Sequence, residues 1–189
     1  KEDPITTHKS CPGKNMVKAD LVVAVVSYMQ AAQPGDHVEV PLAAHTAPTP
    51  VQTDDAVRHS MAKHILDFEA RRDKNGHLAV YNLPPNDGGG RWEIAGINEK
   101  YDGPELLKLK KMLDAGQFDA AEAEAESYYL QNTDVATGWT TNAGVEFYLR
   151  DCVFNRGAKG AARILQLACD VNDDGDVGPQ TRLAMSAIA

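Results

Sequence analysis

The chain lacks the sequence patterns of several common enzyme classes. Its three cysteines, Cys11, Cys152 and Cys169, form no CxxC pair, so they predict neither a zinc nor a redox site and allow at most one internal disulfide. It also contains no GxSxG elbow, phosphate-binding glycine loop or HExxH sequence. These absences disfavour serine hydrolases, nucleotide-binding enzymes, thiol enzymes and zinc amidases.

Basic residues and long apolar runs are also scarce. The 19 lysines and arginines are outnumbered by 27 acidic residues, which gives a formal net charge of −8. Such a chain has no electrostatic footprint for nucleic acid or an anionic membrane surface. The longest apolar stretch, residues 21–29, is far shorter than the roughly 20 residues that span a bilayer. We therefore expect no nucleic-acid partner and no membrane span.

What is present is the composition of a soluble globular protein, 43% hydrophobic and 24% charged. A proline-rich connector after a helix predicted at residues 16–32 places a boundary near residue 50. We predict an N-terminal helix and connector over 1–50, a catalytic domain over 51–144 and a small helical module over 145–189. The start of the chain shows no secretory signal pattern.

The predicted fold is mostly α with one small β-hairpin. A helix over 53–72 follows a Thr53 cap, and strands over 77–83 and 91–97 flank a glycine-rich turn. The remaining elements are helices, the first of which opens with a capping arrangement of Asp102 and Glu105. These helices are predicted over 101–116, 117–132, 143–155, 161–170 and 178–189.

One acidic residue, Glu69, falls within the apolar arc of the helix predicted over 53–72. Apolar surroundings disfavour the charged form of a carboxyl group, and a retained proton is what a general acid needs to protonate a leaving oxygen. On the pattern alone, a solvated helix end beside Arg71 and Arg72 explains Glu69 equally well. Glu69 is nevertheless the first candidate for a catalytic acid.

A glycosidase needs a second carboxylate across the scissile bond, and the predicted hairpin supplies two. Asp87 lies in its turn and Glu93 on its second strand. The rings of Trp92 and Tyr81 are candidates for stacking on sugars, and Asn98 is a further substrate-binding candidate. Taken without context, surface acids and a core tryptophan are the competing interpretation of these residues.

Residues 65–98 resemble the muramidases of glycoside hydrolase family 108, in which a helix carrying the catalytic Glu precedes a D-P-G-G-x-T-x-Y-G-I-S hairpin. Here the helix reads ILDFEARRD and the hairpin reads NDGGGRWEIAGIN, so Glu69 matches the acid and Gly96-Ile97 match the Gly-Ile pair. The chain departs from the family where Glu-Gly-Gly becomes Glu-Ala-Arg and where Thr becomes Glu93. The resemblance implies a lysozyme-like fold in which Glu93 restores a two-carboxylate site.

Residues 153–185 resemble the small peptidoglycan-binding module that follows the catalytic part in this family. The matching features are N-x-G, Ala-Ala-x-x-Leu-Gln and the loop D-G-x-x-G-P-x-T. That loop also begins like a calcium-binding loop, with candidate ligands Asp170, Asn172, Asp174 and Asp176. Because its twelfth position is Thr181 instead of a bidentate Glu, a structural turn is favoured over a weak calcium site.

Together these features predict a muramidase that hydrolyses the β-1,4 bond between N-acetylmuramic acid and N-acetylglucosamine and needs no cofactor. A lytic transglycosylase, a chitin-type hydrolase and a non-catalytic peptidoglycan-binding module remain alternatives. The expected partners are glycan strands, with an immunity protein or a secretion-system carrier in addition. We expect a secreted protein or one delivered to the periplasm of a target bacterium, as a type VI secretion effector or a phage-type endolysin.

Overall fold

The computed structural model describes residues 54–186. The helix predicted at 16–32 and the connector after it lie outside these residues. The described chain forms two compact units, one of residues 59–131 and one of residues 54–58 and 132–186. After residue 59, the boundary between the two compact units lies between Gln131 and Asn132. The boundary near residue 144, between the predicted catalytic domain and the predicted C-terminal module, stays a prediction.

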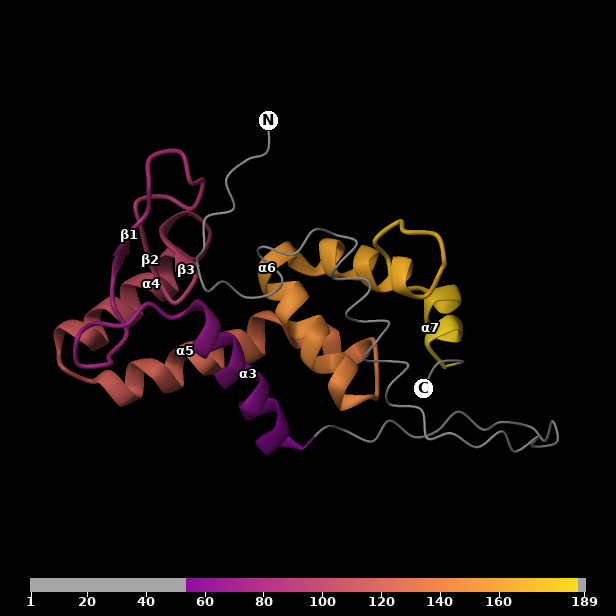
Figure 1. The fold of residues 1–189 in the computed structure, drawn as a ribbon, viewed down its shortest axis with the longest axis horizontal. Helices are drawn as coiled ribbons and strands as arrows, with labels where there is room; N and C mark the ends of the chain where they lie inside the picture. Colours follow the sequence, from indigo (N-terminus) through magenta and orange to yellow (C-terminus); the bar gives the residue numbers. More distant parts are fainter. Residues whose placement is uncertain (1–53, 187–189) are drawn as a thin grey trace. The chain divides into compact units, whose positions relative to one another are not determined.

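The described residues are mostly helical, with one small antiparallel sheet (Figure 1). This confirms the predicted balance of α and β structure. In chain order the elements are α3 (Asp55–Glu69), β1 (Tyr81–Asn82), β2 (Trp92–Ile94), β3 (Ile97–Asn98), α4 (Glu99–Asp114), α5 (Phe118–Asn132), the 3-10 helix η1 (Asp134–Gly138), α6 (Ala143–Ala168) and α7 (Pro179–Ser186). Within residues 54–186, no helix has both the length and the apolar character that crossing a bilayer requires.

The first unit packs its helices and sheet around a shared apolar core. Helix α3 contributes residues four apart, as expected for one face of a helix. The strands contribute Ile94 and Ile97, which are opposite each other in neighbouring strands. The buried apolar side chains of this unit are Met61, Ala62, Ile65, Leu66, Leu78, Ile94, Ala95, Ile97, Leu106, Leu109, Ala121, Ala125 and Tyr129.

The predicted strand over 91–97 is wrong, because this segment is itself a hairpin of β2 and β3. Ala95 and Gly96 form its two-residue turn, and both have positive φ, 51° and 75°. Such turns match the twist of the flanking strands. A residue with a side chain in this region is disfavoured by roughly 1–2 kcal/mol. Ala95 is held there by burial and by the Tyr129 hydroxyl, which donates to its carbonyl oxygen at 2.6 Å.

The other predicted strand, over 77–83, is shorter than expected. Only Tyr81–Asn82 pairs with β2, and Leu78 makes an isolated bridge to Arg72.

Helix α4 begins earlier than predicted, so the capping arrangement of Asp102 and Glu105 is wrong. Asn98 is the N-cap, and its side-chain oxygen accepts the Tyr101 N–H at 3.1 Å. Asp102 lies at a kink with non-helical φ and ψ, two residues before Pro104, which has no N–H to donate. The Asp102 carboxylate accepts hydrogen bonds from the Asn98 N–H and the Tyr128 hydroxyl instead.

In the second unit, the helices predicted over 143–155 and 161–170 are one element, α6, with a kink at Gly157. The φ of Gly157 is 68°, a conformation that glycine adopts without a steric penalty. The side chain of Asn142 caps the N-terminus by accepting the N–H of Gly144 and Val145. The core around α6 consists of Ala136, Val145, Leu149, Cys152, Val153, Ala161, Ala162, Ile164, Leu165, Val177 and Met185.

A charged group is buried within this core. Arg150 is 1% exposed, and its Nε donates to Glu146 Oε1 at 2.8 Å while Nη1 donates to Thr133 Oγ1 at 2.9 Å. Its Nη2 lies 3.5 Å from Asp134 Oδ1. Arg58 Nε approaches the same Glu146 oxygen at 3.4 Å. The guanidinium of Arg150 is thus surrounded by acceptors, as a buried cation requires.

Candidate active site

Glu69 is the last residue of α3 and is 9% exposed. It continues the row of Met61 and Ile65 along the buried face of the helix, each four residues from the next. The helix ends where Ala70 donates to the carbonyl oxygen of Leu66 at 2.8 Å. Glu69 is therefore buried on the apolar face and is not part of a solvated helix end.

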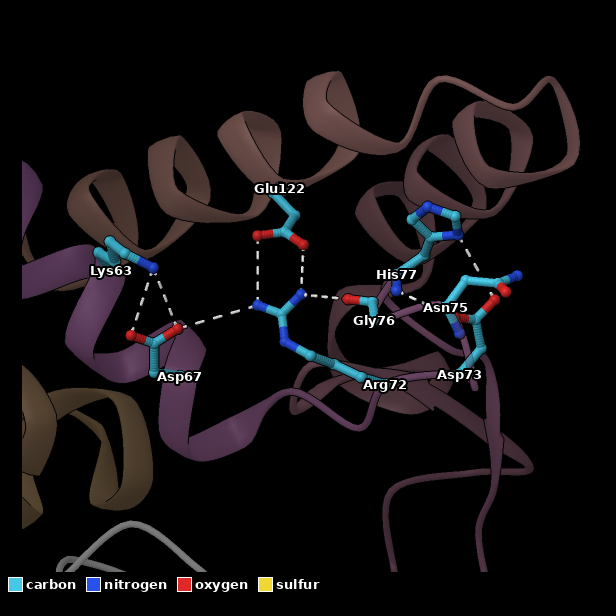
Figure 2. A network of polar contacts seen from close by, with 8 residues as sticks. All are labelled: Lys63, Asp67, Arg72, Asp73, Asn75, Gly76, His77 and Glu122. Atoms are coloured by element: carbon cyan, nitrogen blue, oxygen red, sulfur yellow. Dashed lines mark hydrogen bonds and ion pairs between the residues drawn. The ribbon is translucent and has the colours of Figure 1, made fainter.

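The segment after Glu69 is a short loop held against α5 (Figure 2). Arg72 forms a two-contact ion pair with Glu122, in which Nη2 donates to Oε2 at 3.2 Å, and Arg72 Nη1 also donates to the Gly76 carbonyl oxygen at 2.8 Å. Asp73 closes the loop by accepting the N–H groups of Asn75 and His77 on one oxygen. Desolvation opposes ionisation of Asp73, but these hydrogen bonds outweigh it and lower the pKa of its carboxyl group.

Arg71 contacts a different set of residues from its neighbour Arg72. Its Nε lies 3.5 Å from Glu93 Oε1, and its guanidinium carbon lies 3.5 Å from the centre of the Tyr81 ring. The Arg71 carbonyl oxygen accepts the Ala79 N–H at 2.9 Å, which fixes the backbone of Arg71 close to the start of β1. The Glu93 side chain is 13% exposed, whereas that of Arg71 is 40% exposed.

Three predicted site residues form one row across the sheet. In the strand register, Tyr81 pairs with Glu93 and Glu93 pairs with Asn98. Side chains directly opposite each other in neighbouring strands lie on the same face of a sheet. The structure therefore brings together Tyr81, Glu93 and Asn98, with Arg71 against the first two. Asn98 also has a structural role here, because its side chain caps α4.

Trp92 does not belong to this row. It alternates with Glu93 along β2, so it lies on the face of the buried Ile94. The guanidinium of Arg91 lies 4.9 Å from the centre of a Trp92 ring, and Arg91 Nη2 donates to Glu99 Oε1 at 2.7 Å. This ion pair lowers the pKa of Glu99. Of the two rings considered for stacking on sugars, only that of Tyr81 therefore lies on the same face of the sheet as Glu93.

Asp87 is exposed in the turn between β1 and β2, outside the strand pairs that form the row. Its N–H donates to the Pro84 carbonyl oxygen at 3.1 Å. The same turn contains Gly90, whose φ is 100° and whose missing Cβ would lie 3.0 Å from Glu99 Cβ. Glycine is thus required for the turn to approach the first residues of α4.

The calcium-like loop of the second unit is organised by a side chain of the protein. Gln166, which is buried, donates from Nε2 to Asp174 Oδ1 at 2.7 Å and to the Asp176 carbonyl oxygen at 2.8 Å. Its Oε1 accepts the Gly175 N–H at 2.8 Å. Hydrogen bonds from the Asp176 N–H and Gln166 lower the pKa of Asp174. The amide of Gln166 thus joins residues 174–176 of the loop through three hydrogen bonds.

The remaining calcium candidates do not converge on one point. Asp170, two residues after the end of α6, has a φ of 54°. Its N–H donates to the Leu167 carbonyl oxygen, and the N–H of Val171 donates to the Gln166 carbonyl oxygen. Asn172 donates its side-chain N–H to Asp174 Oδ2 at 3.3 Å. Over residues 54–186, no group of three or more His, Cys, Asp or Glu side chains is arranged to hold a metal ion. The interpretation of the motif as a structural turn stays a prediction.

Sequence reasoning did not predict a contribution of Arg71 to the site. The position of Arg71 next to Arg72 could have indicated this contribution, because consecutive side chains in an extended segment point in opposite directions. If Arg72 contacts α5, then Arg71 is directed towards the sheet. Comparisons of the chain with models of protein families, with curated proteins and with solved structures found no significant match.

Proposed function

We propose that the protein is a muramidase that hydrolyses the β-1,4 bond between N-acetylmuramic acid and N-acetylglucosamine in peptidoglycan. The observation that carries this proposal is a buried carboxyl group, Glu69, followed two residues later by an arginine that contacts a second carboxyl group, Glu93. A carboxyl group buried on a helix and a second carboxyl group beside a cation are two settings that suit the two carboxyl groups of glycoside hydrolysis. An acid on a helix followed by an acid on a hairpin also agrees with the resemblance to family 108.

In this proposal Glu69 is the general acid. It donates its proton to the bridging oxygen as the bond from that oxygen to the anomeric carbon breaks. Glu93 stabilises the positive charge that develops on the sugar ring or activates the water that adds to the anomeric carbon. Asp87 is the alternative second carboxylate. Tyr81 and Asn98, on the same face of the sheet as Glu93, are the residues proposed to contact the sugar.

We assign the module predicted over 145–189 a role in binding peptidoglycan. Its support is the sequence of residues 153–185 and the loop that Gln166 holds in a fixed shape. The proposed substrate places the site of action outside the cytoplasm, in the periplasm of a target bacterium or at a cell wall. Delivery as a secretion effector, with an immunity protein in the producing cell, belongs to the same proposal.

The test compares Glu69→Gln with Asp67→Asn on purified sacculi. Both replacements convert an acid of α3 to its amide, but Asp67 is exposed and pairs with Lys63 on the same helix and, at 3.8 Å, with Arg72. We expect Glu69→Gln to lower the release of reducing ends by about 10²–10⁴-fold, the usual contribution of a general acid. Asp67→Asn should stay within about twofold of the parent, since solvent-exposed ion pairs contribute little. Circular dichroism and melting curves verify that both variants fold.

The same assay separates the alternatives. Mass spectrometry of anhydro products would identify a lytic transglycosylase, and cleavage of polymers without the lactyl ether would identify a chitin-type hydrolase. Co-sedimentation with sacculi without any release of reducing ends would identify a binding module. A Glu69→Gln variant that digests sacculi as fast as the parent would overturn the proposal.

A further inference from the structure

Two features distinguish Arg71 from an ordinary surface ion pair: it contacts an aromatic ring as well as a carboxylate, and these two partners lie opposite each other in the sheet. Its guanidinium lies over the Tyr81 ring at 3.5 Å while Nε lies 3.5 Å from Glu93 Oε1. Tyr81 and Glu93 are also cross-strand partners. Arg71 therefore contacts two neighbouring members of the row Tyr81–Glu93–Asn98 at once.

The backbone around Arg71 is fixed from both sides. Its carbonyl oxygen accepts the N–H of Ala79, two residues before Tyr81, and the next residue, Arg72, pairs with Glu122 on α5. A planar guanidinium that stacks on a ring loses freedom to rotate, and its edge then presents N–H groups in a fixed direction. Stacking on Tyr81 thus directs the edge of Arg71 at the Glu93 carboxylate.

We propose that Arg71 is a positioning residue that holds the Glu93 carboxylate in its orientation for catalysis. The inference rests on the proposed function, because it assigns Glu93 as the second carboxylate. It concerns a pair in which this chain differs from the family it resembles, since both positions carry other residue types there. Arg71 and Glu93 act as a pair: the Glu93 carboxylate takes part in the reaction, and Arg71 fixes the orientation of that carboxylate.

The test is a double-mutant cycle on sacculi with Arg71→Ala and Glu93→Gln. A misplaced catalytic group lowers the rate of the chemical step by up to about 10²-fold, so Arg71→Ala should lower kcat by about 10- to 100-fold and leave KM within about twofold. In the Glu93→Gln background the same change should lower kcat less than about twofold, because residues that act as a unit are not additive.

Chemical rescue adds a readout that a structural role would not give. Because 40% of the Arg71 side chain is exposed, guanidinium ion from solution has access to the space left in Arg71→Ala. We expect millimolar guanidinium to restore part of kcat, and ammonium at equal concentration to restore little. Arg71→Lys should stay impaired, since an ammonium group cannot stack and direct an edge as a guanidinium does.

Arg91→Ala is the matched control. Arg91 also lies over an aromatic ring and pairs with a glutamate, Glu99, but the ring belongs to Trp92 on the other face of the sheet. Its kcat should equal that of the parent. Melting temperatures of both arginine variants are compared, so that a loss of folding is not mistaken for a loss of positioning.

Each outcome decides the proposal. An equal loss of kcat in both arginine variants, or an additive loss in the Glu93→Gln background, would overturn the positioning role. An active parent and an inactive Glu69→Gln variant, together with an unchanged Arg71→Ala variant, would overturn it while the proposed function stands. A parent that releases no products would overturn both.

Discussion

The two units use arginine in opposite ways. In the second unit, Arg150 is buried and surrounded by Glu146, Thr133 and Asp134. In the first unit, Arg71 is 40% exposed and contacts one carboxylate and one ring. A buried guanidinium whose N–H groups all face acceptors cannot contact a ligand. A half-exposed guanidinium beside a carboxylate can still do so. The difference favours Arg71 for a role in the proposed chemistry and Arg150 for a structural role inside the second unit.

The largest effect should come from breaking the buried ion pair of the second unit. Arg150→Met removes one partner and leaves Glu146 buried, so we expect the free energy of unfolding to fall by about 3–5 kcal/mol. Arg150→Met with Glu146→Leu removes both charges and should recover part of that loss, although Arg58 then loses its contact with Glu146. Urea unfolding of the full chain measures both variants. If the double variant were as unstable as the single one, the ion pair would not be the cause.

A smaller effect is expected from the loop in the same unit. Gln166→Leu keeps the size of the side chain but removes the partners of Asp176 and Gly175, which should lower the free energy of unfolding by about 1–3 kcal/mol. Addition of Ca²⁺ should leave the melting temperature of parent and variant unchanged. A calcium-dependent rise in either would show that the loop binds the ion and would weaken its assignment as a structural turn.

The smallest effect concerns Glu105 of α4, a half-buried carboxyl group of the first unit. Burial raises the pKa of Glu105 above its ordinary value of 4.5, and nearby Glu124 adds to the shift although Lys108 opposes it. With a raised folded-state pKa, the stabilising contribution of the protonated form is complete below the unfolded-state pKa. That contribution is lost as pH rises through the folded-state pKa.

Glu105→Gln should therefore raise the melting temperature slightly at pH 7, and the difference from the parent should shrink towards pH 4. Asp114→Asn is the control on the same helix, since Asp114 is exposed and pairs with Lys110. A stabilisation by Glu105→Gln that did not depend on pH would point to a cause other than the titration of this carboxyl group.

Local sequence patterns predicted most of the described α-helical segments and the position of Glu69 on a buried helix face, because both depend on periodicity along one element. The row Tyr81–Glu93–Asn98 could not be predicted, since it depends on a turn at Ala95-Gly96 that no strong turn sequence marks. The roles of Asn98 and Gln166 were also inaccessible, because each is set by hydrogen bonds that form only in the fold. The hydrogen bonds of Gln166 to Asp174 and to the Asp176 carbonyl oxygen were inaccessible as well, because a run of ligand-type residues does not reveal which amide contacts them in the fold.

The hydrogen bond from Tyr129 to Ala95 has a consequence for the order of folding. The donor lies 34 residues downstream of the acceptor, on α5. Contacts between distant residues form late, because the intervening chain must first be brought together. The sheet that holds Glu93 should therefore reach its final form only once α5 has been synthesised and packed, so a nascent chain acquires this part of its proposed catalytic apparatus after the helix that follows it.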